Sequence, residues 1–332
     1  MIYDQMLRAL QQSQQDYAVL NDRLAKNKKI LAPSDDVMGA MRSLAYRVSI
    51  NSNGQYQRNI DGATTNLKLT STTLSTYYDV LGSIRKLLLT NMSGSPDPTN
   101  SAGNAEIAGQ LRDEIFGLAI TNAGGRFLFS GFRTNQQPYA AGTYAYQGDN
   151  GVINVPIDQG AAMPLNVTGN EAFSYSIGAP GTTYSKQIGG GLNVHYTQGA
   201  GTTINVEIRG TDDTTVLDTF SFSNVMQMTD TLSSALGSNN TSRIEAMVDP
   251  FNRIQDQVAA VQSDVGSRLT SLTDQSNKLT QNTNTLSDVL SSTEDADMTE
   301  TAMQLQKANT SLQALYAASA KILSQSLLDF LQ

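Results

Sequence analysis

The sequence has no cysteine, no tryptophan and one histidine among its 332 residues. Without cysteine, no disulfide, thiol nucleophile or cysteine metal site can form, so stability must come from packing. The single imidazole, His195, has no recognisable serine motif beside it and is expected to be an ordinary loop or strand residue. Zinc would need several ligands from His195 and carboxylates, so no metal and no cofactor is predicted.

Positive charge is also scarce, with 22 Lys and Arg against 30 Asp and Glu, which gives a net charge of -8. A chain of this charge repels nucleic acid and anionic membranes, so no nucleic-acid partner is expected. No apolar run reaches the roughly 18 residues that a membrane span needs, so no membrane insertion is expected. The N-terminal stretch "MIYDQMLRALQQSQQDY" lacks the order of a secretory signal, which by itself favours the cytoplasm.

The N-terminal 125 residues have the spacing of long helices. Residues at alternating steps of three and four predict a coiled-coil seam in the first helix. This seam consists of Tyr3, Met6, Leu10, Ser13, Tyr17, Leu20, Leu24, Asn27 and Leu31. A second helix is expected from about Asp35 to Asn91. Its seam repeats every seven residues at Ile60, Leu67, Leu74, Leu81 and Leu88, with Ala63, Thr70, Tyr77 and Ile84 at the intermediate positions. A third, from Glu106 to about Asn122, is expected to close on Gly124 and Gly125.

The last 90 residues return to the same helical pattern. One seam runs through Phe251, Ile254, Val258, Val261, Val265, Leu272, Leu279, Leu286 and Val289. A final segment places Met298, Leu305, Leu312, Leu315 and Ile322 on one side. The terminal seams need partners to persist, because isolated helices are marginal in water. Sequence physics leaves two alternatives open here: assembly with neighbouring subunits, or an ordinary intramolecular bundle.

Between the helical zones, residues 126 to 240 are rich in glycine and read as strands. "INVEIRG" and "TFSFSNV" alternate in strand fashion, and "TDDTTVLD" is expected to be a strand turn. Carboxylates there could serve a sugar-active enzyme, although the absence of tryptophan counts against one. The predicted fold is therefore mainly α: a long antiparallel coiled-coil-like rod of paired N- and C-terminal segments, with a small β domain inserted at its tip.

Both long helical zones are interrupted. Pro33 disfavours helical geometry at Ala32, so the first helix is expected to end near Leu31 and Ser34 to cap the next one. Asp35, Asp36 and, on the returning chain, Glu294, Asp295 and Asp297 would place negative charge at helix starts. For the last helix the expected cap is Ser292 or Thr293. The two breaks predict a domain joint formed by Pro33, Ser34, Asp35, Asp36, Glu294, Asp295 and Asp297.

The segments around these breaks resemble the bacterial flagellin family. "ILAPSDDVMGAMRSLAY" resembles the segment of flagellins that carries a paired aspartate, and "EDADMTETAMQLQKANTSLQALYAASAKI" resembles their C-terminal segment. Two further stretches, "QYQRNIDGATTNL" and "GGRFLFSGFRTNQQPY", resemble the branch of the family at the hook-filament junction more than filament flagellins. The residues of these stretches singled out for the match are Arg58, Asn59, Phe127, Phe129, Ser130 and Gly131.

The resemblance implies a secreted, extracellular structural protein of the flagellum, exported without a cleaved signal, in place of the cytoplasmic location above. It implies no catalysis but self-assembly into a ring-like homo-oligomer that joins hook to filament and templates flagellin. The implied partners are further copies of the chain, a sister junction protein, flagellin, an export chaperone and the type III export apparatus. Filament flagellin is the first alternative, and a secreted carbohydrate-active enzyme is the second.

The resemblance also implies a division of the chain into three parts. Residues 1–33 and 293–332 would be the assembly domain, disordered or mobile in the monomer. Residues 34–125 and 242–292 would be the helical rod, and residues 126–241 a variable outer β domain. The assembly seam would consist of Tyr3, Met6, Leu10, Tyr17, Leu20, Leu24, Leu305, Leu312, Leu315 and Ile322.

Overall fold

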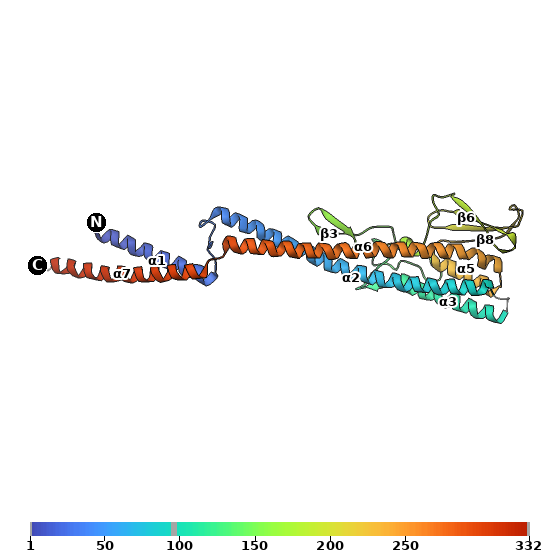
Figure 1. Cartoon of the computed structure of the whole chain (residues 1–332), viewed down its shortest axis with the longest axis horizontal. Helices are drawn as coiled ribbons and strands as arrows, with labels where there is room; N and C mark the ends of the chain where they lie inside the picture. Colours follow the sequence, from blue (N-terminus) through green and yellow to red (C-terminus); the bar gives the residue numbers. More distant parts are fainter. Residues whose placement is uncertain (1, 94–97, 331–332) are drawn as a thin grey trace. The chain divides into compact units, whose positions relative to one another are not determined.

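A computed structural model describes residues 2–93 and 98–330 of the chain (Figure 1). Its helices are α1 (Ile2–Lys26), α2 (Val37–Ser93), α3 (Pro98–Ala119), α4 (Gly169–Phe173), η1 (Gly189–Gly191), α5 (Val225–Gly237), α6 (Thr241–Glu294) and α7 (Met298–Phe330). Its strands are β1 (Asn122–Ala123), β2 (Arg126–Phe127), β3 (Asn154–Asp158), β4 (Ala161–Pro164), β5 (Thr183–Gln187), β6 (Asn193–Gln198), β7 (Ile204–Arg209) and β8 (Val216–Phe222). Long helices from the two ends of the chain are paired, and antiparallel sheets are inserted between them, so the predicted fold class is confirmed.

The chain forms two compact units, each built from segments far apart in the sequence. The terminal unit consists of Met1–Gln55 and Asn277–Gln332, and the central unit of Tyr56–Ser276. Helices α2 and α6 contribute to both units. The proposed three-part division is a finer one and stays a prediction.

The core of the central unit follows the seven-residue repeat of α2. All nine predicted seam residues from Ile60 to Leu88 are buried. They are covered in part by α6, on which Phe251, Ile254, Val258, Val261, Val265 and Leu272 are buried too. Antiparallel pairing of the two helices is marked by hydrogen bonds from Gln57 to Ser276 (2.8 Å) and from Arg85 to Gln255 (3.5 Å). Each large apolar side chain buried in this way contributes about 1.5 to 3 kcal/mol.

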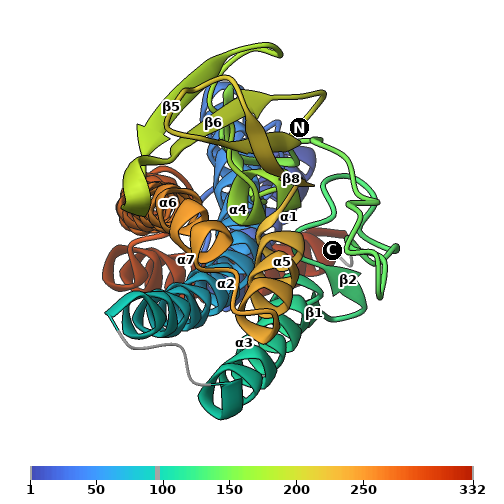
Figure 2. The ribbon, with the colours of Figure 1, turned by 90° about the vertical axis from the view of Figure 1, so that its right-hand side faces the viewer.

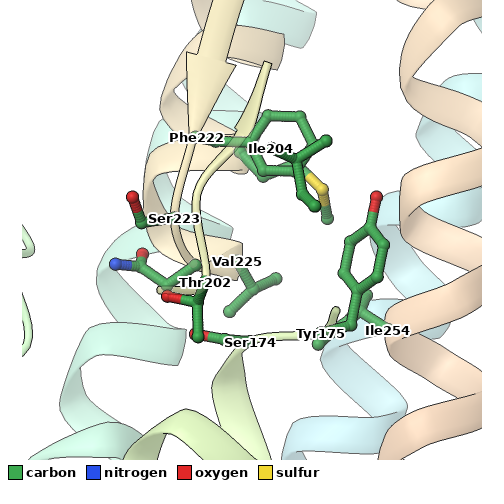
Figure 3. A pocket seen from close by; sticks show the side chains of 10 residues that line it. Ser174, Tyr175, Thr202, Ile204, Phe222, Ser223, Val225 and Ile254 are labelled. Carbon is green, nitrogen blue, oxygen red and sulfur yellow. The ribbon is translucent and has the colours of Figure 1, made fainter. Parts of the chain in front are cut away.

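A four-stranded antiparallel sheet in the order β5-β6-β7-β8 lies beside α6 and α5 in the central unit (Figure 2). Its strands alternate as predicted, so that Ile204, Val206 and Ile208 are buried along β7. The hydroxyl of Tyr196 donates to the carbonyl of Ala246 on α6 at 2.6 Å, which attaches the sheet to the helix. The apolar side chains of Ile204, Phe222, Val225, Met228 and Ile254 lie between the sheet and these helices (Figure 3).

The strand-like zone also contains a helix that the sequence analysis missed. Helix α5 begins after Asn224, whose side chain accepts a hydrogen bond from the backbone N–H of Gln227 at 3.1 Å. It ends at Gly237 and packs against α3. Val225, Met228, Leu232 and Leu236 are buried at helical spacing. The sequence contains this helical spacing of three and four residues. It was overlooked because the glycine-rich, strand-like segments before it led to the whole zone being interpreted as strands.

Two predicted boundaries of α3 are wrong. The helix begins at Pro98 rather than Glu106, because proline suits the first helical position, where its missing N–H has no partner anyway. It ends at Ala119, and Gly124 and Gly125 do not cap it. With φ of 58° and 84°, the two glycines form the turn between β1 and β2, which needs positive φ at both positions.

Candidate functional site: the interhelical joint

The terminal unit pairs α1 with α7 (Figure 1). The amide of Gln14 donates to the hydroxyl of Tyr316 across this pair at 2.7 Å. The predicted seam residues lie half-buried on the two helices, at Met6, Leu10, Tyr17, Leu20, Leu24, Leu305, Leu312 and Leu315. The side chains of Tyr3 and Ile322 lie outside the described residues. Their common role in assembly stays a prediction.

The terminal unit has almost no apolar core of its own. Leu279 is the one fully buried large apolar side chain in the described part of this unit. The seam of α6 becomes less buried toward the C-terminal end of the helix, where Leu286 is half-buried and Val289 is exposed. Large apolar side chains are exposed elsewhere in the unit at Leu7, Val19, Val37, Met38, Met41, Leu44, Val48, Met298, Met303 and Tyr316. Burial of apolar surface is the main driving force of folding, and this unit gains little of it within one copy of the chain.

The first break begins earlier than predicted. Helix α1 ends at Lys26 and not near Leu31. Asn27 adopts a left-handed conformation, with φ of 54°. The N–H of Lys28 then donates to the carbonyl of Arg23 at 3.1 Å, which is the hydrogen bond of a Schellman cap. Asparagine tolerates positive φ better than most residues, so it stops the helix before Pro33 is reached.

Helix α2 is capped by Asp36, so the prediction that Ser34 caps it is wrong. The Asp36 carboxylate accepts from the N–H of Gly39 at 2.9 Å. Asp35 closes the loop before the helix, accepting from the N–H groups of Leu31 and Ala32 at 2.9 and 3.0 Å. These backbone hydrogen bonds lower the pKa of Asp35. Exposed Pro33 and Ser34 occupy the same loop.

The second break lies between α6 and α7. Helix α6 continues through the residues predicted to cap the last helix and ends at Glu294. Asp297 is the cap instead, since its carboxylate accepts from the N–H groups of Thr299 and Glu300 at 2.9 and 3.1 Å. The prediction of Ser292 or Thr293 as cap is therefore wrong. We call residues 27–36 and 294–297 together the interhelical joint.

Glu294 links the break after α1 to the break after α6 through its side chain. Its buried carboxylate accepts two hydrogen bonds from Nη2 of Arg47, at 2.6 and 2.7 Å, and one from Nζ of Lys28. Burial opposes ionisation of the carboxyl group, but the hydrogen bonds from Arg47 and Lys28 hold its pKa below the ordinary value. We call these three residues the Glu294 cluster. It fixes the end of α6 to both α2 and the loop after α1.

Backbone hydrogen bonds also join the loop after α1 to the segment between α6 and α7. The N–H of Lys29 donates to the carbonyl of Glu294 at 2.8 Å, and the N–H of Ala296 donates to the carbonyl of Asn27 at 3.2 Å. Lys28 and Asp295 form an antiparallel bridge between these bonds. The joint residues predicted from the two distant segments therefore lie together. What the sequence did not reveal are the cations Lys28 and Arg47, because nothing in their spacing points to Glu294.

The family-motif residues lie in the central unit. Phe129 is buried edge-on to Phe173, with ring centroids 5.0 Å apart, and the hydroxyl of Ser130 donates to the carbonyl of Gln136 at 2.7 Å. Gly131 has φ of 69°, and the backbone and carboxylate of Asp149 lie against its Cα, so only glycine fits. The remaining three are Phe127 in β2, exposed Arg58, and Asn59, whose amide donates to the carbonyl of Pro156 at 2.9 Å.

Two pockets of the central unit are lined by uncharged side chains. The apolar space of Figure 3 does not admit a water molecule. An open groove of about 560 Å³ is lined by uncharged side chains, including Tyr146, whose pKa burial raises to about 12. No group of three or more His, Asp or Glu side chains that could hold a metal occurs in the described ranges. Nor is any described helix long and apolar enough to cross a membrane.

His195 lies in β6, and its Nε2 is 2.6 Å from Oδ1 of Asp213. Asp213 belongs to the turn before β8, at the position where a strand turn was predicted. Asp212 in the same turn accepts hydrogen bonds from the hydroxyls of Thr214 and Thr215, both at 2.7 Å. The histidine and the acidic turn thus have structural partners within the sheet.

Two curated flagellar proteins are similar in sequence to about half of this chain. Among curated proteins, flagellar hook-associated protein 3 of Salmonella typhimurium is 24% identical over 175 residues, which are 52% of this chain. The match spans 55% of the relative's own length. The counterpart from Escherichia coli is 25% identical and is likewise matched over 55% of its length.

Solved structures share the fold. A putative flagellar hook-associated protein from Vibrio parahaemolyticus superposes with a TM-score of 0.61 and 20% identity, over 79% of this chain and 100% of that one. The Legionella pneumophila flagellar hook-associated protein-3 gives 0.57 and 16%, over 75% and 98%.

Two family models match the ends of the chain. Residues 1–134 match the N-terminal helical region of bacterial flagellins, and residues 248–331 match their C-terminal helical region. These segments contain α1, α2 and α3 on one side and most of α6 with α7 on the other, so they include every helix of the joint. Together the two regions cover well over half of the chain, which therefore belongs to the bacterial flagellin family.

Proposed function

We propose that this chain is a structural adaptor that joins the hook of the bacterial flagellum to its filament by self-assembly. The observation that carries the proposal is the terminal unit, which buries one large apolar side chain and exposes many among its described residues. Exposed apolar faces on paired helices suit a part that becomes buried between neighbouring subunits. The likeness to hook-associated proteins favours the junction over the filament itself.

The proposed partners follow from this position. Further copies of the chain would form a ring-like zone, seated on a sister junction protein and templating flagellin. An export chaperone and the type III export apparatus would deliver the chain to the outside of the cell. The role needs no catalysis, and the uncharged groove of the central unit supplies no acid or base near neutral pH.

Deleting the gene tests the proposal. Loss of an adaptor leaves hooks without filaments and releases flagellin monomers into the medium, and a plasmid copy of the chain restores filaments. If the chain were filament flagellin, the deletion would remove flagellin from the medium as well. Exported flagellin that still polymerises on the hooks of the deletion strain would contradict the proposal.

Carbohydrate cleavage is the remaining alternative. A chain truncated at both termini that hydrolyses any member of a broad glycan panel would support it. The adaptor account expects no turnover on that panel.

A further inference from the structure

Five large apolar side chains are exposed along the first turns of α2. The exposed fractions of Val37, Met38, Met41, Leu44 and Val48 lie between 57% and 64%. Positions 37, 41, 44 and 48 recur at steps of four, three and four, so these side chains form one line along the helix. We call the five residues the apolar stripe. Monomeric proteins seldom leave so continuous an apolar surface uncovered.

The stripe lies on the side of α2 opposite to its own helix partner. Gly39, Ser43 and Asn53, on the other side of the helix, are buried. The amide of Asn53 donates to the hydroxyl of Thr283 on α6 at 3.2 Å, which marks the face that α6 covers. In the described part of the terminal unit, the stripe is therefore left open to a separate molecule.

The charged residues near the stripe indicate which kind of surface could cover it. Between Val37 and Gln55, within the terminal unit, the charged residues are Arg42 and Arg47, and Arg47 already binds Glu294 of its own chain. Arg42 is exposed beside the stripe. Residues 288–303, at the end of α6 and the start of α7, contain five acidic residues and no cation. Asp288, Asp297 and Glu300 are exposed there, as are Met298 (48%) and Met303 (64%). We call residues 288–303 the acidic segment.

We propose that the apolar stripe of one copy of the chain packs against the acidic segment of the next copy. Each copy carries both surfaces, so the contact is head-to-tail and can repeat around a ring. Exposed methionines lie on both surfaces, and Arg42 of one copy would face the exposed carboxylates of Asp288, Asp297 and Glu300 of the next. A stripe-on-stripe contact would instead bring Arg42 against Arg42. The inference rests on the proposed function, because it assigns the surfaces through which the copies assemble.

The absence of cysteine makes a direct test possible. Two copies, one with Met41→Cys and one with Met303→Cys, are expressed together in the deletion strain, and hook-filament complexes are isolated. A short bis-maleimide reagent is then expected to link the two chains into a heterodimer. The matched control pairs Met41→Cys with Leu217→Cys on β8, which is 56% exposed. The control yield is expected to be lower by roughly tenfold, since copies that meet only by chance are not held together.

Charge reversal gives a second readout. Arg42→Glu is expected to lower the yield of the heterodimer by roughly tenfold, because like charges then face each other. Glu300→Arg on the partner copy is expected to restore it. The amount of each variant exported to the medium controls for folding.

The outcomes separate the inference from the proposed function. Complexes that contain the chain but give only Met41→Cys homodimers, or no link at all, overturn the inference and leave the adaptor role standing. Complexes that lack even the unsubstituted chain, expressed in the same strain, overturn both.

Discussion

Glu294 connects three segments of the chain through one carboxylate. Replacing it with glutamine removes the charge that holds Lys28 and Arg47, which we expect to weaken the joint by about 1 to 2 kcal/mol. The amide of Lys29, which donates to the Glu294 carbonyl, reports on the joint. In isolated hook-filament complexes, its hydrogen-exchange protection should fall roughly tenfold in Glu294→Gln, since tenfold corresponds to about 1.4 kcal/mol. Asp274→Asn, at an exposed position on the same helix and outside the acidic segment, is the control; equal protection in both variants would contradict the role of the cluster.

The same cluster predicts a dependence on pH. Because the pKa of Glu294 is held below its ordinary value of 4.5, the stabilisation is fully present above that value. It is lost as the pH falls through the lowered pKa, where the folded joint must take up a proton. Protection of the Lys29 amide in the assembled complexes, corrected for intrinsic exchange, should therefore fall on acidification in the wild type. In Glu294→Gln it should stay low and flat over that range.

Gly131 allows a matched comparison within the family motif. Gly131 and Gly142 both have positive φ, 69° and 81°, but only Gly131 has atoms of Asp149 against it. Gly131→Ala should therefore destabilise the central unit by about 1 to 3 kcal/mol more than Gly142→Ala, through the clash that the added methyl creates. Thermal unfolding followed by circular dichroism measures the difference. Equal melting temperatures would show that the close approach of Asp149 has no energetic weight.

At the scale of elements, the sequence predicted periodicity better than boundaries. The seven-residue repeat of α2 corresponds to a buried line because the spacing is a direct consequence of helix geometry. The end of α1 and the capping residue of α2 were misplaced because Asn27, Ser34, Asp35 and Asp36 can all stop or cap a helix. Which of them does so depends on hydrogen bonds that form only in the folded loop. The partners of Glu294 could not be found for the same reason, since they are set by tertiary contact.

The weakly packed terminal helices carry the element-scale prediction. In dilute solution, we expect a protease to trim about 30 to 40 residues from each end while the central unit survives, because half-buried seams cannot hold long helices in water. Mass spectrometry of the trimmed core gives the cleavage sites. Cleavage that starts within the central unit would contradict the expectation, as would full protection of both termini in a verified monomer.

At the scale of the whole molecule, the two units differ in how complete they are. The central unit buries aromatic and aliphatic side chains from α2, α6 and the sheet, so we expect it to fold without neighbouring subunits. The terminal unit keeps most of its large apolar side chains exposed or half-buried among the described residues, so its stability should depend on neighbours. This contrast is the physical basis for the proposed adaptor role, in which the terminal unit orders as subunits join.

Hydrogen exchange of the terminal unit, before and after assembly, tests that claim most directly. Peptides from residues 2–55 and 277–321 are compared in the purified monomer and in isolated hook-filament complexes, with peptides from the central unit as the internal control. The account predicts that the terminal peptides exchange rapidly in the monomer and become strongly protected on assembly, while the central peptides change little. Terminal peptides that are equally protected in both states would contradict it.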